Sequence, residues 1–80
     1  IFKLYSIEDE GFYGLSNLNY LQLNYNEIRI IKNRPFAGLS KLQILDLENC
    51  LIESIDMGAF FDLSNLNKLY LNMNKMSLIN

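Results

Sequence analysis

The chain has 80 residues, of which half are hydrophobic and a fifth are charged, a composition typical of folded proteins rather than disordered ones. Its formal net charge of −2 is too small to indicate binding to nucleic acid or to an anionic membrane surface. The single cysteine excludes an internal disulfide, and no apolar run approaches the roughly 18 residues of a membrane-spanning helix.

Leucines return along the chain at a fixed interval of 24 residues, which predicts a repeat architecture. The recurring leucine triplets are Leu18, Leu21 and Leu23, then Leu42, Leu45 and Leu47, then Leu66, Leu69 and Leu71. The same step relates Asn26 to Cys50 and Asn74, Phe12 to Phe36 and Phe60, and Leu15 to Leu39 and Leu63. We therefore divide residues 1–80 into a partial repeat (1–17), two full repeats (18–41 and 42–65) and a second partial repeat (66–80).

Each repeat begins with a short alternation of apolar and polar residues, as in Leu21-Gln22-Leu23-Asn24. A period of two is the pattern of a half-buried strand, so the repeats predict one strand each, stacked in parallel. The rest of the repeat must return the chain to the start of the next strand. Turn-forming residues occur in this return segment, namely Gly11, Gly14, Pro35, Gly38, Gly58 and Ser64. We expect the phenylalanine column to fill the space behind these turns.

Both full repeats fit the pattern LxxLxLxx[N/C]xIxxIxxxxFxxLxx, which resembles the 24-residue class of extracellular leucine-rich repeats. Toll-like receptors, lamprey variable lymphocyte receptors and small leucine-rich proteoglycans contain repeats of this kind. The resemblance implies an α/β-type repeat solenoid, a segment of a leucine-rich-repeat horseshoe. It has one short parallel strand per repeat on the concave face and a loop or 3-10 return on the convex face.

The Asn26, Cys50 and Asn74 column is expected to lock neighbouring turns together. An asparagine amide there can bond backbone groups that would otherwise be buried without partners. For Cys50 the alternatives are a reactive thiol or a small buried residue whose S–H donor replaces the amide. We favour the buried residue, because the resembled motif admits cysteine at this position and the chain has no histidine to activate a thiolate.

Charges alternate in sign between residues that are 24 apart and therefore expected to be neighbours. The expected neighbours are Lys3 with Glu27, Arg29 with Glu53, Glu10 with Arg34, and Glu8 with Lys32 and Asp56. One interpretation is a charged docking stripe. We prefer solvated ion pairs that disfavour a slipped stacking register, since exposed pairs add only about 0 to 1 kcal/mol each.

The polar positions of the predicted strands form a grid on the concave face, which is the candidate site for a partner. The grid consists of Tyr20, Gln22, Asn24, Ile44, Asp46, Glu48, Lys68, Tyr70 and Asn72, with Tyr25, Asn49 and Met73 at its margin. Tyrosines offer rigid contact area and amides offer hydrogen bonds. We expect Ile44 to be exposed at the centre, and Asp46 and Glu48 to form a negative spot. The alternative is that these are ordinary solvated strand positions.

No catalytic, cofactor-binding or metal-binding pattern occurs in the chain, so an enzyme is not expected. Two carboxylates such as Asp46 and Glu48 would bind a cation only weakly. The resemblance implies a recognition module of an innate-immune receptor ectodomain similar to Toll-like receptors. Its implied partner is a protein or a microbial ligand, with a second receptor chain in a dimer as a further candidate. The alternatives are a structural or adhesive matrix protein and an intracellular scaffold.

An extracellular or cell-surface location is expected from the repeat class, with secretion as the second choice. Any membrane contact would come through parts outside this segment. The register of the repeats places both ends of the chain within a repeat. We therefore expect a fragment of a longer solenoid, because solenoids are normally closed by terminal caps.

Overall fold

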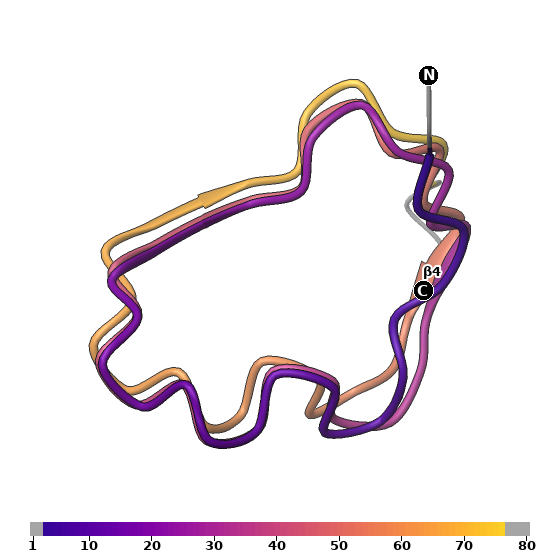
Figure 1. Cartoon of the computed structure of the whole chain (residues 1–80). Coiled ribbons are helices and arrows are strands. Elements are labelled where there is room, and N and C mark those ends of the chain that lie inside the picture. The colour runs from indigo at the N-terminus through magenta and orange to yellow at the C-terminus, as the bar shows by residue number, and fades with distance from the viewer. Residues whose placement is uncertain (1–2, 77–80) are drawn as a thin grey trace.

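The structure, a computed structural model, describes residues 3–76 as a stack of coils that superimpose when viewed along the stacking axis (Figure 1). The first coil comprises residues 3–17, the second 18–41, the third 42–65 and the fourth 66–76. Five strands and no helix occur between residues 3 and 76. Over this range, accordingly, the chain has no helix of the length and apolarity needed to cross a bilayer.

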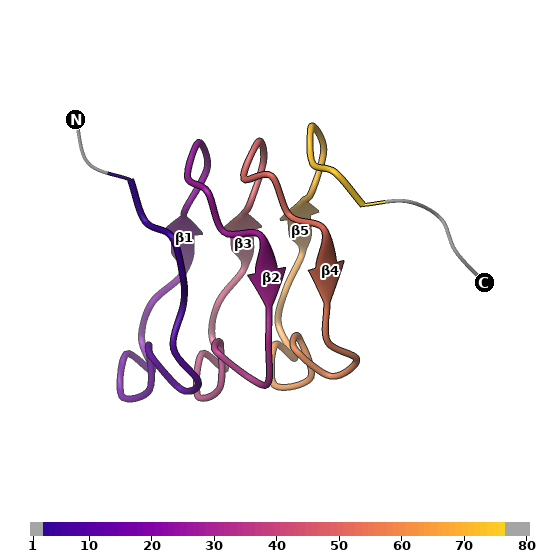
Figure 2. The same cartoon turned by 90° about the vertical axis from the view of Figure 1, so that its right-hand side faces the viewer.

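The larger sheet contains one three-residue strand from each of the last three coils. Its strands are β1 (Tyr20–Gln22), β3 (Ile44–Asp46) and β5 (Lys68–Tyr70), in the order β1-β3-β5. All pairs are parallel, and Leu21 lies opposite Leu45, which lies opposite Leu69. The strands follow one another along one side of the stack (Figure 2). The predicted 24-residue register of parallel strands is thus confirmed.

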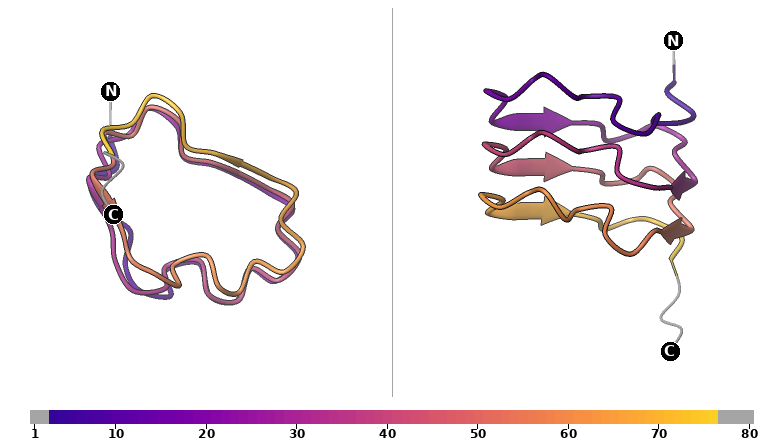
Figure 3. Two further views of the ribbon diagram at one scale, coloured as in Figure 1. Left: turned by 180° about the vertical axis from the view of Figure 1, so that it is seen from behind. Right: turned by 90° about the horizontal axis from the view of Figure 1, so that it is seen from below.

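A second sheet, which the sequence analysis did not predict, lies on the flank of the coils. It consists of β2 (Ile30–Ile31) and β4 (Ser54–Ile55), which pair in parallel with Ile30 opposite Ser54. In the right-hand view of Figure 3, the strands of each sheet lie one above another, and the two sheets occupy different sides of the same stack. Ile31 points into the core with 1% of its surface exposed, whereas Ile30 is exposed. Two residues are too few to produce a recognisable alternation, which explains why these strands were missed.

The core is formed by columns of side chains that repeat from coil to coil. Phe12, Phe36 and Phe60 stack behind the return segment, with ring centroids 6.0 and 5.8 Å apart and nearly parallel planes. The fully buried residues come mainly from the second and third coils, because within residues 3–76 these two coils have a neighbouring coil on both sides. They include Ile28, Ile31, Phe36, Leu39, Leu42, Leu45, Leu47 and Ile52. The predicted phenylalanine and leucine columns are confirmed.

The return segment is a chain of β-turns rather than a 3-10 helix. In the second coil, Ala37 N–H donates to Arg34 C=O, Leu39 N–H to Phe36 C=O and Leu42 N–H to Leu39 C=O, at 3.2, 3.3 and 3.1 Å. Gly38 has a φ of +90°, and a Cβ at this position would lie 3.0 Å from the Tyr13 ring. Both facts favour glycine at this turn.

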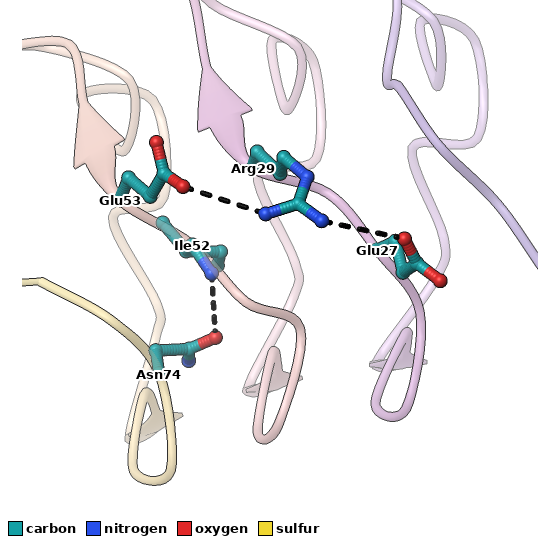
Figure 4. A network of polar contacts seen from close by, with 5 residues as sticks. All are labelled: Glu27, Arg29, Ile52, Glu53 and Asn74. Atoms are coloured by element: carbon teal, nitrogen blue, oxygen red, sulfur yellow. Dashed lines mark hydrogen bonds and ion pairs between the residues drawn. The ribbon is translucent and has the colours of Figure 1, made fainter.

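Asn74 joins the third and fourth coils through its side-chain amide. Its Oδ1 accepts from the Cys50 and Ile52 N–H groups at 2.8 and 2.9 Å, and the second of these bonds is drawn in Figure 4. Its Nδ2 donates to the Leu47 and Leu71 carbonyls, both at 2.9 Å. The amide therefore satisfies four backbone groups of two coils at once.

Cys50 occupies the corresponding position one coil earlier. Its Sγ–H donates to the Leu23 carbonyl at 3.0 Å, which replaces the inter-coil bond that Asn74 makes to Leu47. Cys50 is completely buried. Burial raises the pKa of the thiol; the nearby Asn26 N–H lowers it, and the Asp46 carboxylate raises it further. The thiol is therefore kept neutral, in agreement with the predicted structural role.

The first coil runs beside β2 without pairing to it. Glu53 N–H donates to Arg29 C=O at 2.7 Å and Asp56 N–H to Ile31 C=O at 2.8 Å, which joins the third coil to the second. Within residues 3–76 no equivalent bond links residues 5–8 to residues 29–32. In the described part of the chain, backbone bonds between these coils occur on either side of the gap, at Leu4 and at Glu10. The gap opens as a hollow of about 560 Å³.

Candidate functional site

The solvent-facing side of the larger sheet, here called the strand face, contains the predicted grid. The pairing register places Tyr20, Ile44 and Lys68 in one row and Gln22, Asp46 and Tyr70 in the next. Backbone bonding continues beyond the strands, because Tyr25 N–H donates to Glu48 C=O and Asn49 N–H to Asn72 C=O. A third row of Asn24, Glu48 and Asn72 follows from this continuation. The nine side chains therefore come from adjacent, regularly spaced positions.

The outer columns of the grid are the accessible ones. Tyr20 is 51% exposed and Tyr70 is 39% exposed, and Gln22, Lys68 and Asn72 are also exposed. An aromatic ring, an amide and an ammonium group thus lie within reach of a partner. Tyrosine offers a large apolar area with a hydroxyl that can bond, and few rotatable bonds have to be fixed on binding.

The centre of the grid differs from the expectation. Ile44 is half-buried rather than exposed, and Asp46 is only 8% exposed. The pairing register places Ile44 between Tyr20 and Lys68 and Asp46 between Gln22 and Tyr70, so β3 has a neighbouring strand on each side. Asp46 Oδ1 also accepts from the Glu48 N–H at 3.0 Å. The expected negative spot is therefore reduced to the half-buried Glu48.

The margin of the strand face is a column of residues in the left-handed conformation. Tyr25, Asn49 and Met73 have φ values of 63°, 56° and 63°. This conformation costs a residue with a large side chain more than it costs asparagine or glycine. Tyr25 and Met73 are exposed, so the backbone turn presents their side chains to solvent. The sharp turn explains how the chain leaves the sheet after each strand.

One of the predicted charge columns forms an ion pair. An Arg29 guanidinium nitrogen lies 3.4 Å from a Glu53 carboxylate oxygen, and a second lies 3.6 Å from Glu27 of the same coil (Figure 4). Arg29 and Glu53 are both more than half exposed, so solvent screens their attraction. This pair links the second and third coils weakly.

The other charge columns do not form the expected pairs. Arg34 binds Asp62 instead of Glu10, with Nη2 at 2.5 and 2.6 Å from the two carboxylate oxygens. In residues 3–76, Lys3 and Glu27 make no ion pair with each other, and neither do Glu8, Lys32 and Asp56. Asp56 instead accepts from the Asn33 N–H at 2.7 Å. A backbone donor at the turn competes successfully with a solvated lysine for this carboxylate.

Metal-binding geometry is absent from the part of the chain that the structure describes, since no three His, Cys, Asp or Glu side chains cluster between residues 3 and 76. The only nucleophilic thiol of the sequence is the buried Cys50.

A parallel sheet on one face, a stacked phenylalanine column and an amide ladder define a solenoid of 24-residue coils. The family model described as Leucine rich repeat matches residues 3–52 and 40–80, and the chain belongs to the leucine-rich-repeat family. Domains of this family generally mediate protein–protein interactions. None of the curated proteins searched matches the chain significantly.

Proposed function

We propose that the strand face of this chain binds a partner protein, and that the exposed side chains Tyr20, Tyr70 and Lys68 make the principal contacts. The observation that carries this proposal is the parallel register, which aligns the three strands and holds these side chains on a regular backbone. A preorganised surface loses little conformational entropy on binding. Tyrosines that become buried under a partner are also frequent hot spots of protein interfaces.

A photo-crosslinking amino acid at position 70 tests the strand face, with the same amino acid at position 13 as the control. Tyr13 is a more exposed tyrosine than Tyr70, with 71% of its surface accessible against 39%, but it lies on the return segment. In an extract of the source cells we expect a discrete cross-linked protein from position 70, none from position 13, and loss of the product when Tyr20→Ala is added. Equal products from positions 70 and 13 would contradict the proposal.

We further propose that the chain is part of an innate-immune receptor ectodomain similar to Toll-like receptors, at the cell surface, with a protein or microbial ligand. The 24-residue repeat length and the phenylalanine column support this assignment, which rests on analogy. The sequence of the full source polypeptide tests it. A membrane span and a signalling domain after further repeats would support the receptor. A secreted chain without them would support a matrix protein, and a chain with neither a leader nor a span would support an intracellular scaffold.

A further inference from the structure

A groove of about 590 Å³ crosses the outer flank of the stack just beyond the ends of β2 and β4. Its walls come from three successive coils, so it faces outward rather than along the stacking axis. The residues that matter are Asp9 and Glu10 of the first coil, Arg34 of the second, and Asp56, Met57 and Phe61 of the third. The groove lies on a different side of the coil from the strand face.

Two apolar side chains in this groove are strongly exposed. Met57 is 99% exposed and Phe61 is 79% exposed. The equivalent of Met57 in the second coil is the polar Asn33, and the equivalent of Phe61 is the small Ala37. Apolar side chains gathered in a hollow of the surface are typical of a docking site.

The position of Phe61 is held by a charged neighbour. The Arg34 guanidinium lies 5.8 Å from the centre of the Phe61 ring, within the range of a cation–π interaction. Arg34 is in turn fixed by its pairing with both carboxylate oxygens of Asp62. The aromatic ring is therefore partly preorganised to receive an apolar group from a partner.

The charge of the groove selects the chemistry of that partner. Asp9 Oδ1 accepts from the Arg34 N–H at 3.1 Å, and Asp56 Oδ2 accepts from the Asn33 N–H, so both carboxylates are held in place. Glu10 adds a third negative charge, while Asp62 offsets the single positive charge of Arg34. The potential over Met57 and Phe61 is therefore negative and favours a cationic segment over an anionic one.

We propose that this groove docks a basic segment of a partner protein. An apolar side chain of that segment packs against Met57 and Phe61, and flanking Lys or Arg side chains lie against Asp9, Glu10 and Asp56. This surface is independent of the strand face, so the chain has two sites for partners on different sides of the coil.

Two short peptides that differ only in charge test the proposal on the full chain. The first is acetyl-Lys-Leu-Lys-Leu-Lys-amide, and the second carries glutamate in place of lysine. We expect the lysine peptide to shift the backbone amide resonances of residues 56–61 and to bind at least tenfold more tightly than the glutamate peptide. Raising the salt concentration to about 0.5 M should weaken its binding severalfold.

Variants taken from the chain's own repeats locate the binding. Met57→Asn and Phe61→Ala introduce the residues of the second coil at these exposed positions, and Glu10→Gln removes one charge. We expect the combination of Met57→Asn and Phe61→Ala to lower the affinity for the lysine peptide at least tenfold, and Glu10→Gln to lower it about threefold. Met73→Asn, an exposed methionine at the margin of the strand face, is the control and should have no effect.

Three results would overturn the proposal: no binding of the lysine peptide, equal binding of the glutamate peptide, or unchanged affinity in the Met57→Asn and Phe61→Ala variant. A circular dichroism spectrum identical to that of the parent chain shows that each variant is folded. Because Met57 is almost fully exposed, the single Met57→Asn variant provides a test that does not disturb the core.

Discussion

Replacing Asn74 with alanine should destabilise the fold far more than its partial exposure indicates. The side chain makes four hydrogen bonds to backbone groups, two as acceptor and two as donor. Each such bond contributes about 1 kcal/mol net, and a buried group left without its partner costs more. Because Asn74 is only partly buried, water can replace some of the hydrogen bonds that the alanine removes. We therefore expect a loss of about 2–4 kcal/mol in the free energy of unfolding.

Urea denaturation followed by circular dichroism measures this loss. For a chain of this size the dependence on urea is about 1 kcal/mol per M, so the midpoint should fall by about 2 M or more. The matched control is Asn72→Ala, because the bond that Asn72 makes to Asn49 uses its backbone carbonyl. This control should change stability by no more than about 0.5 kcal/mol. If Asn74→Ala and Asn72→Ala shifted the midpoint equally, the amide ladder would not hold the coils together.

Four further predictions follow from single features of the structure. Tyr25→Asn should raise the free energy of unfolding by about 0.5–1 kcal/mol, since Tyr25 has a φ of 63° and asparagine tolerates this conformation; a decrease in urea midpoint would contradict it. Phe36→Ala should lower the free energy of unfolding by about 3–5 kcal/mol, because it leaves a cavity between two stacked rings, and thermal unfolding should show a correspondingly lower midpoint. Cys50 should react with iodoacetamide at pH 7 only after urea unfolding, and rapid labelling of the folded chain would show that its thiol is not buried. Because burial raises the pKa of this thiol in the folded chain, the free energy of unfolding should also decrease as the pH rises above the ordinary thiol pKa. A double-mutant cycle on Arg29 and Glu53 should give a coupling of about 0.2–1 kcal/mol that disappears in 1 M salt, and a larger salt-resistant value would contradict a screened pair.

The backbone register could be predicted from the sequence because it depends only on the repeat interval. Leu21, Leu45 and Leu69 are 24 residues apart, and a parallel stack of equal coils must place them opposite one another. The amide ladder and the phenylalanine column follow for the same reason. These features need no knowledge of side-chain conformations.

Features that depend on side-chain direction could not be predicted in this way. Arg34 reaches Asp62, which is 28 residues away, because a long side chain is not confined to the position directly opposite. The burial of Asp46 depends on the size of the side chains that flank β3. The groove lined by Met57 was also missed. One signal for it was present in the sequence, because the apolar Met57 occupies the position that the polar Asn33 has in the preceding repeat.

The unpaired stretch between the first coil and β2 has a consequence for the cooperativity of unfolding. In a one-dimensional stack, each coil is stabilised mainly by its neighbours, so the weakest junction opens first. Arg29 and Lys32 lack the inter-coil bonds that Glu53 and Asp56 make at equivalent positions. Hydrogen exchange should therefore be fast at the amides of residues 29 and 32 and slow at those of residues 53 and 56. The first coil would then detach at a lower denaturant concentration than the one at which the second and third coils unfold together.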